Sequence, residues 1–331
     1  MLAGATSNVA PTIEDEHRPF GVPGPDRRDA GRFVVETREL GKRYGDAIVA
    51  VNQLTMRVRR GEVYGFLGPN GAGKTTTLRI LLGLIRPTSG SARVLGAAPG
   101  SPAGLSRIGA LVETPAFYPF LSGRDNLSVL ARHAGVPSPR IEVVLEEVEL
   151  TGRAGDRFAT YSLGMKQRLG VAAALLKDPE LLILDEPTNG MDAAGMAEMR
   201  TFIRSLGENG RTVLLSSHLM GEVEQVCDRV GVIHGGRLVG EGTLDDLRGR
   251  ASLRVLAEPL DAAQRVVAGV SGVEHVAIVD DGLRIAADPG SAAEINRALV
   301  ESGVAVSELR LERASLEKIF LELTQGAEEG R

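Results

Sequence analysis

Four short segments carry residues that could act together on a nucleoside triphosphate. In chain order they are GPNGAGKTT from Gly68, YSLGMKQ from Tyr161, LLILDEPTNGMD from Leu181 and LLSSH from Leu214. The first fits G-x-x-x-x-G-K-[ST], a loop whose glycines let backbone N–H groups surround phosphates. In such a loop Lys74 reaches the β- and γ-phosphates and the Thr75 hydroxyl binds Mg²⁺. The predicted phosphate contacts are Gly68, Pro69, Asn70, Gly71, Ala72, Gly73, Lys74, Thr75 and Thr76.

Two acidic residues follow the apolar segment 181–184. Asp185 stands at a predicted strand tip, where a carboxylate can hold Mg²⁺ together with Thr75. Glu186 comes next and points to the opposite face of the strand end, which suits a general base that polarises the attacking water. Such a pair alone is usually a solvated strand end. Its place after the phosphate loop and before PTNGMD favours the catalytic interpretation.

His218 ends the next predicted strand, TVLLSS. A lone histidine is more often a structural residue. The carboxyl ends of parallel strands, however, are where ligands collect, so we expect its imidazole to hydrogen-bond the γ-phosphate.

Tyr161 begins a segment that leads into an apolar helix, KQRLGVAAALL. Ser162 is a predicted N-cap, with backbone N–H groups of Leu163 and Gly164 exposed at the helix start. Two interpretations remain open. Either the serine only caps the helix, or this second anion site binds the γ-phosphate held by another subunit.

Alternating strands and helices surround these segments. Apolar alternation runs through FVVETREL and AIVAVNQLTMRVRR, and the strand EVYGFLG leads into the glycine loop and the helix TTTLRILLGLI. After Pro115 the pattern becomes helical, and strands return at LLILDEP, TVLLSSH and VGVIHGG. This order predicts an α/β fold with a mostly parallel sheet covered by helices.

The chain is predicted to divide into three parts. Residues 1–31 mix Pro, Gly and charge without periodicity, which predicts a disordered tail or, alternatively, a partner-binding arm. Residues 32–247 form the ATP-binding domain, with a helical subdomain at about 115–177. Residues 248–331 show a β-α-β-β-α-β order followed by a helix, SLEKIFLELT, and predict a small ferredoxin-like accessory domain.

Composition narrows the function classes. The 331 residues carry a net charge of -5, which argues against a broad nucleic-acid-binding face. The single cysteine, Cys227, cannot form an internal disulfide and fits a core position. The first residues lack the basic and apolar blocks of a secretory signal, and no apolar run reaches the ~18 residues of a membrane span. If the protein serves a membrane process, another chain must cross the membrane.

The ordered motifs resemble those of the ATP-binding subunits of ABC transporters, which have a P-loop NTPase fold. In that family residues 68–76 resemble the Walker A motif, residues 161–165 the signature sequence, and residues 181–186 the Walker B motif with its catalytic glutamate. Residues 189–192, ending at Asp192, resemble the D-loop, and His218 the switch histidine. Tyr44 stands where the family stacks an aromatic ring on adenine.

The resemblance implies a mechanism and partners. Two copies would close head to tail around two ATP and two Mg²⁺, each ATP lying between the glycine loop of one copy and Ser162 and Gly164 of the other. A separately encoded integral membrane permease is implied, with the ATPase a homodimer on the cytoplasmic, inner face of the plasma membrane. No nucleic-acid partner is expected. A soluble ABC ATPase acting on DNA or ribosomes is the alternative, although zinc-binding cysteines, a second cassette and long heptads are missing.

Two positions depart from the family pattern. Glu113 stands where a glutamine is usual, and we expect it to contact Mg²⁺ or the attacking water; Leu163 replaces the first signature glycine. Both are similar to variants in bacitracin, lantibiotic and daunorubicin exporters, which implies export of a drug, antibiotic peptide or related amphiphile. The closing helix resembles a segment linked to pairing with the membrane subunit. It could instead pack on its own sheet, and the accessory domain could serve regulation.

Overall fold

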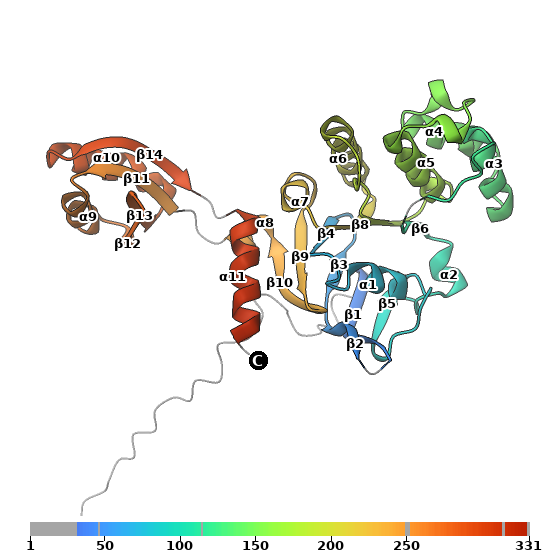
Figure 1. The fold of residues 1–331 in the computed structure, drawn as a ribbon, viewed down its shortest axis with the longest axis horizontal. Coiled ribbons are helices and arrows are strands. Elements are labelled where there is room, and N and C mark those ends of the chain that lie inside the picture. Colours follow the sequence, from blue (N-terminus) through green and yellow to red (C-terminus); the bar gives the residue numbers. More distant parts are fainter. Residues whose placement is uncertain (1–31, 46, 114, 249–251, 313–314, 330–331) are drawn as a thin grey trace, which may run out of the picture.

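The structure is a computed structural model that describes residues 32–45, 47–113, 115–248, 252–312 and 315–329 (Figure 1). The predicted disordered tail, residues 1–31, lies outside this part of the chain. The described residues form a larger α/β region and a smaller α+β region, after which the last helix returns to the larger one.

A six-stranded sheet forms the centre of the larger region. Its strand order is β10-β9-β4-β8-β7-β6, with all neighbours parallel except β10 and β9. The strands are β4 (Val63–Leu67), β6 (Ile108–Leu111), β7 (Leu181–Asp185), β8 (Thr212–Ser217), β9 (Arg229–His234) and β10 (Arg237–Thr243). Every residue of β4, β7 and β8 is buried, as expected for parallel strands covered on both faces.

Alternate residues of each central strand belong to two different cores. From β7, Leu182 and Leu184 pack toward α6 (Ala193–Glu208) and α7 (Met220–Val226). Leu181 and Ile183 pack on the other face, toward α1 (Lys74–Leu81). A strand with no polar face can therefore be placed only in the middle of the molecule.

An antiparallel sheet completes the core on the α1 side. It contains β1 (Phe33–Tyr44), β2 (Ile48–Leu54), β3 (Arg57–Arg59) and β5 (Ser89–Val94). Strand β1 pairs with the other three strands. Leu54 of this sheet, Tyr64 of β4 and Leu78 of α1 are fully buried in the shared core, so the two sheets and the helix form one packed unit.

The segment between β6 and β7 is helical. It contains α3 (Gly123–Ala134), α4 (Pro139–Glu147), 3₁₀ turns at Thr151–Arg153 and Phe158–Thr160, and α5 (Leu163–Leu175); a short α2 (Pro102–Leu105) precedes β6. Ser122 caps α3 by accepting from the backbone N–H of Asp125. Helix α5 is buried over most of its circumference, because it packs between the other helices and β6.

The smaller region has the ferredoxin-like order. It contains β11 (Ser252–Glu258), α9 (Leu260–Ala268), β12 (Val273–Val279), β13 (Gly282–Ala287), a 3₁₀ turn at Pro289–Ser291, α10 (Ala292–Glu301) and β14 (Ala305–Glu312). Its sheet is antiparallel in the order β12-β13-β11-β14. Leu253 and Val255 pack under Val267 of α9 and Leu299 of α10, so both helices cover one face.

The last helix, α11 (Leu316–Glu329), packs on the larger region rather than on the accessory sheet. It contacts α7, β10 and α8 (Leu244–Arg248) (Figure 1). Leu316 and Ile319 are buried in the core that also contains β7 and β8. The alternative in which this helix packs on its own sheet is therefore not what the structure shows. A single domain boundary at residue 247 stays a prediction, since α8 spans that position.

Two further features bear on sequence expectations. Cys227 is buried against β4, and burial raises the pKa of its thiol, which fits a plain core position. In the described part of the chain, no helix combines the length and apolar character needed to cross a bilayer.

Candidate active site

The phosphate-loop motif lies where a buried strand meets a helix. Strand β4 ends at Leu67, and α1 begins at Lys74. Gly73 has a φ of 104°, and a Cβ there would lie 2.2 Å from the carbonyl oxygen of Ala50. Only glycine fits this conformation and this approach. No described side chain caps the start of α1, so its first N–H groups are available to an anion.

The other predicted loop residues lie between these two ends. Pro69, Asn70 and Gly71 are exposed, Gly68 and Ala72 are buried, and Thr76 lies in the first turn of α1. The exposed residues form the rim of the loop, while the buried ones fix it against the sheet.

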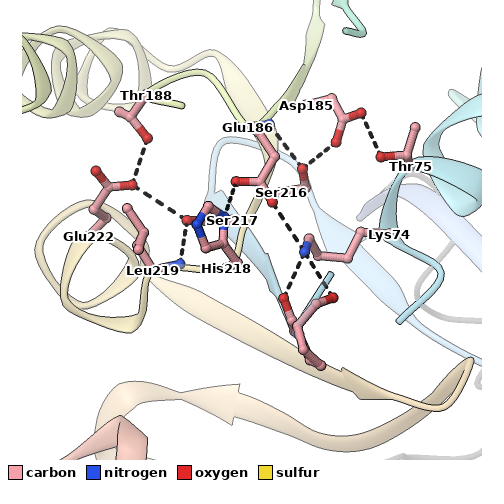
Figure 2. Close-up of polar contacts among 12 residues, drawn as sticks. Lys74, Thr75, Asp185, Glu186, Thr188, Ser216, Ser217, His218, Leu219 and Glu222 are labelled. Carbon is pink, nitrogen blue, oxygen red and sulfur yellow. Dashed lines mark hydrogen bonds and ion pairs between the residues drawn. The ribbon is translucent and has the colours of Figure 1, made fainter. Parts of the chain in front are cut away.

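Lys74 reaches back across the loop. Its Nζ donates to the carbonyl oxygens of Gly68 at 2.7 Å and Pro69 at 3.3 Å, and pairs with Glu186 Oε1 at 3.1 Å (Figure 2). Its side chain is only 6% exposed. A buried ammonium held inside the loop is placed to meet phosphate oxygens that enter the same space.

Asp185 and Thr75 meet at the end of β7. The Thr75 hydroxyl donates to Asp185 Oδ2 at 2.8 Å, and the Ser216 hydroxyl donates to Oδ1 at 2.5 Å (Figure 2). Asp185 and Ser216 are register partners on adjacent strands, which explains the second contact. The parallel sheet therefore brings a hydroxyl from α1 and a carboxylate from β7 to one point.

The chemistry of these two groups fits Mg²⁺. The ion prefers oxygen ligands and is commonly bound by one or two carboxylates together with waters and substrate phosphates. Among the described residues, no group of three His, Cys, Asp or Glu side chains is arranged to hold a metal. A hydroxyl and one carboxylate beside a phosphate loop fit a Mg²⁺ ion whose other ligands are waters and substrate phosphates. They do not fit a site made of protein ligands alone.

Glu186 and His218 form a pair at the ends of neighbouring strands. Glu186 Oε2 lies 2.8 Å from His218 Nδ1, while Oε1 faces Lys74 (Figure 2). Glu186 has a φ of 48°, a left-handed conformation that a non-glycine residue adopts at a cost. Its N–H donates to Ser216 Oγ at 3.0 Å and to the Ser216 carbonyl at 3.2 Å, which holds this turn.

Four residues in this cluster were not predicted from the sequence. Ser216 hydrogen-bonds both Asp185 and the N–H of Glu186. Glu222 accepts from Thr188 and Ser217, on the side of His218 away from Lys74 (Figure 2). Ser216 could have been found from LLSSH, because it is the position that pairs with Asp185 once the strands are placed side by side. Glu222 lies in a helix, where nothing in its spacing distinguishes it from a surface acid.

Ser162 and Gly164 lie at the start of α5, in a part of the molecule separate from α1 (Figure 1). Ser162 Oγ accepts from the N–H of Met165 at 3.2 Å, which confirms its role as an N-cap. Among the described residues, no hydrogen bond joins either residue to the phosphate loop of the same chain.

A pocket of about 380 Å³ separates the start of α5 from the start of α6. Ser162 and Gly164 line one side, and Gly190 and Asp192 line the other. Asp192 caps α6, since its Oδ1 accepts from the N–H of Gly195 at 2.9 Å. Two helix N-termini therefore open into one hollow.

Glu113 has a different partner from the one expected. Its carboxylate pairs with Arg79 of α1, its side chain is 60% exposed, and its φ is 68°. In the described part of the chain, no hydrogen bond or ion pair connects it to Thr75 or Asp185. The structure thus brings Thr75 and Asp185 together and leaves Glu113 outside that group, so its metal role stays a prediction.

Tyr44 ends β1 beside the hairpin to β2, where it pairs with Ile48. Tyr44 is 42% exposed, and Lys42 Nζ lies 5.1 Å from the centroid of its ring. An exposed aromatic face beside a cation can stack on a flat ring. Its contact with adenine stays a prediction.

Comparisons with known proteins agree with this geometry. A family model described as ABC transporter matches residues 51–189. The bacitracin transport ATP-binding proteins BcrA of Enterococcus faecalis and Bacillus licheniformis are 39% and 41% identical, over 89% and 88% of this chain and 97% and 98% of theirs. The daunorubicin resistance ATP-binding protein DrrA3 of Streptomyces coeruleorubidus is 38% identical, over 86% of this chain and 93% of its own.

Solved structures show the same fold. An ATP-binding subunit of an ABC transporter aligns with a TM-score of 0.58 and 31% identity, covering 65% of this chain and 92% of that one. CbiO1 of Clostridium perfringens aligns with a TM-score of 0.59 and 27% identity, covering 64% and 89%. The predicted P-loop NTPase fold class is confirmed. With a phosphate loop, an acid pair and a histidine gathered at one sheet edge, this chain belongs to the ATP-binding, ATP-hydrolysing subunits of ABC transporters.

Proposed function

We propose that this ATPase drives the export of a drug, an antibiotic peptide or a similar amphiphile through a separately encoded membrane permease. The observation that supports it is similarity along nearly the whole chain, accessory region included, to proteins named for bacitracin transport and daunorubicin resistance. A role on DNA or ribosomes finds no comparable support, because these relatives are named for transport or drug resistance. The protein would act at the inner, cytoplasmic face of the plasma membrane.

The residues of the site would divide the chemistry as follows. Lys74 and the first N–H groups of α1 bind the β- and γ-phosphates. Glu186 accepts a proton from the attacking water, and His218, 2.8 Å from it, orients that carboxylate and the γ-phosphate. Thr75 and Asp185 would hold Mg²⁺, which neutralises charge on the phosphates when bound.

Two copies of the chain would complete each site. Ser162 and Gly164 lie at a helix N-terminus that opens into a hollow. In the described part of the chain, neither is hydrogen-bonded to the chain's own phosphate loop. A γ-phosphate presented by a second copy would meet those N–H groups. Such a head-to-tail contact is isologous, since each copy contributes its loop to one site and its Ser162 to the other.

The Glu186→Gln variant tests the dimer. It keeps the shape of the side chain but removes the base, so the ATP-bound state should persist. We expect sedimentation with ATP and Mg²⁺ to give a dimer, and the same variant without nucleotide to give a monomer. A chain that remains monomeric at saturating ATP contradicts head-to-tail closure.

Affinity capture tests the transport role. The same variant, loaded with ATP and Mg²⁺, is captured from detergent-solubilised membranes of the native cell. A multi-helix membrane protein in the eluate is expected. Soluble partners or nucleic acid alone would instead support a non-transport ABC ATPase.

A further inference from the structure

A buried carboxylate lies behind the Glu186–His218 pair and belongs to none of the four sequence motifs. It is Glu222 of α7, which is only 7% exposed. An acidic side chain is rarely buried without a partner, because removing it from water is costly. Its contacts therefore indicate what it does.

Glu222 connects the two strand ends that carry the pair. Its Oε2 accepts from the Thr188 hydroxyl at 2.6 Å and from the Ser217 hydroxyl at 3.4 Å (Figure 2). Thr188 follows Glu186 by two residues, and Ser217 directly precedes His218. One carboxylate oxygen thus bridges the segment after β7 and the segment that ends β8.

The bridge extends into the turn that carries the histidine. Ser217 Oγ also accepts from the N–H of Leu219 at 3.0 Å, so the residues on both sides of His218 are fixed by one hydroxyl. Thr188 is 4% exposed and lines, with Pro187 and Glu222, a cavity of about 10 Å³, about the space of one water molecule. Hydrogen bonds therefore restrain both the segment after β7, through Thr188, and the end of β8, through Ser217.

This restraint matters because Glu186 holds an unfavourable backbone conformation, with a φ of 48°. Such conformations persist where the surrounding structure over-determines them. Ser216 holds the turn from one side and Thr188, through Glu222, from the other. The second oxygen of Glu222, Oε1, is buried and has no hydrogen-bond partner among the described residues.

We propose that Glu222 is a positioning residue for ATP hydrolysis. By joining Thr188 to Ser217, it holds the Glu186 carboxylate at hydrogen-bond distance from His218. The inference rests on the roles proposed above for Glu186 and His218. Among the described residues, Glu222 makes no hydrogen bond to either of them, so it acts only through Thr188 and Ser217.

Helix α7 offers a matched control. Glu224 lies two residues further along, and its Oε1 accepts from the Leu316 N–H at 3.1 Å and pairs with Arg248 at 2.9 Å. It therefore connects α7 to α11 and α8, not to the site. Replacing it removes an acid from the same helix without changing Thr188 or Ser217.

The experiment compares steady-state ATPase kinetics, ATP affinity and thermal unfolding of the full chain for Glu222→Ala, Thr188→Val and Glu224→Ala. For the first two we expect kcat to fall by about tenfold to hundredfold, as for loss of a hydrogen bond to a charged group, while ATP affinity stays within about threefold. Glu224→Ala should keep kcat within about twofold. Thr188→Val preserves shape, so it reports on the bridge even if Glu222→Ala fails to fold.

A double-mutant cycle separates positioning from a merely structural effect. Single-turnover hydrolysis is measured for Glu222→Ala in the His218→Ala background. If Glu222 acts through the histidine, the added change should be less than about threefold. Independent, multiplicative losses overturn the inference, as do variants that are less stable but keep the kcat of the wild type.

Glu186→Gln, measured alongside, separates this inference from the function on which it rests. If Glu186→Gln is inactive and Glu222→Ala is fully active, the proposed site stands and the positioning role is wrong. If Glu186→Gln still hydrolyses ATP at the rate of the wild type, the assigned roles themselves are wrong.

Discussion

The carboxyl edge of the central sheet and the uncovered face of the accessory sheet both gather charged side chains, but in opposite ways. At the central edge Lys74, Asp185 and Glu186 are largely buried and converge on one space. On the accessory face Arg254 lies directly opposite both Arg284 and Arg310 on adjacent strands. Strand alternation places these arginines on the side away from the core residues Leu253 and Val255, and thus from α9 and α10.

The partners of the two sets differ accordingly. Three arginines in a row repel one another, and each is paired with an acid: Asp281, Glu312 and Glu308 respectively. Each of these pairs has at least one partly exposed member, so water screens it in part. The central cluster lies inside the fold, where the same charges interact more strongly and must be held in place. A cluster of charged side chains therefore does not by itself indicate an active site. Burial of the charges and their convergence on one space do.

Among the variants of the two charged clusters, Lys74→Ala should cause the largest loss of activity. It removes the buried cation that faces both the loop carbonyls and Glu186, so we expect ATP affinity and hydrolysis to fall by more than about hundredfold. Nucleotide binding by fluorescence and phosphate release measure the two losses. Arg284→Ala on the accessory face is the control and should leave both unchanged. Equal effects of the two variants would show that burial and convergence do not separate the central cluster from the accessory one.

Leu316→Ala tests how the accessory region is attached. Leu316 is 1% exposed in the core of the larger region, so its truncation should destabilise the fold by about 2–5 kcal/mol. Urea unfolding of the full chain measures the change. Leu311→Ala, at a position 44% exposed on β14, should cost less than about 1 kcal/mol. If both variants lower the free energy of unfolding by the same amount, α11 does not pack where the structure places it.

Glu113→Gln tests whether Glu113 belongs to the catalytic cluster. Its carboxylate is exposed and paired with Arg79, outside the group formed by Thr75 and Asp185. We expect ATPase activity to change by less than about tenfold, since only a surface ion pair is lost. Phosphate release at saturating ATP is the measurement. A loss above about hundredfold would show that the carboxylate has an essential role and belongs to the cluster.

Arg254→Ala should have the smallest effect. The pair with Asp281 involves an acid that is 75% exposed, so stability should change by less than about 1 kcal/mol. Thermal unfolding and ATPase assays on one preparation measure both quantities. A large loss of activity without loss of stability would contradict the view that the accessory face is uninvolved in hydrolysis.

Much of the fold and site was predictable from local pattern. Gly73 and Lys74 identify the loop because glycine and lysine are each required there by backbone conformation and charge. The placement of Asp185 beside Thr75 follows from a general property of parallel sheets, whose carboxyl ends meet at one edge. The ferredoxin-like order after residue 251 follows from alternation and turns in the same way.

Other features depend on contacts between residues far apart in the chain. Glu113 pairs with Arg79, α11 packs on α7 and α8, and Glu222 meets Thr188. The sequence around Glu113, α11 and Glu222 contains no motif that distinguishes them. Their contacts depend on which distant segment the fold brings close. No period or motif encodes such a meeting.

The ATPase chemistry could be predicted from the order of residues alone, because the glycine loop with its lysine, the two acids and the histidine each follow an apolar strand. The contacts that hold these residues in place depend on the fold. It brings Glu186 and His218 to 2.8 Å from different strands, and it places Glu222 behind them. Motifs reflect local backbone and charge requirements, whereas supporting contacts come from packing between segments that lie far apart in the chain.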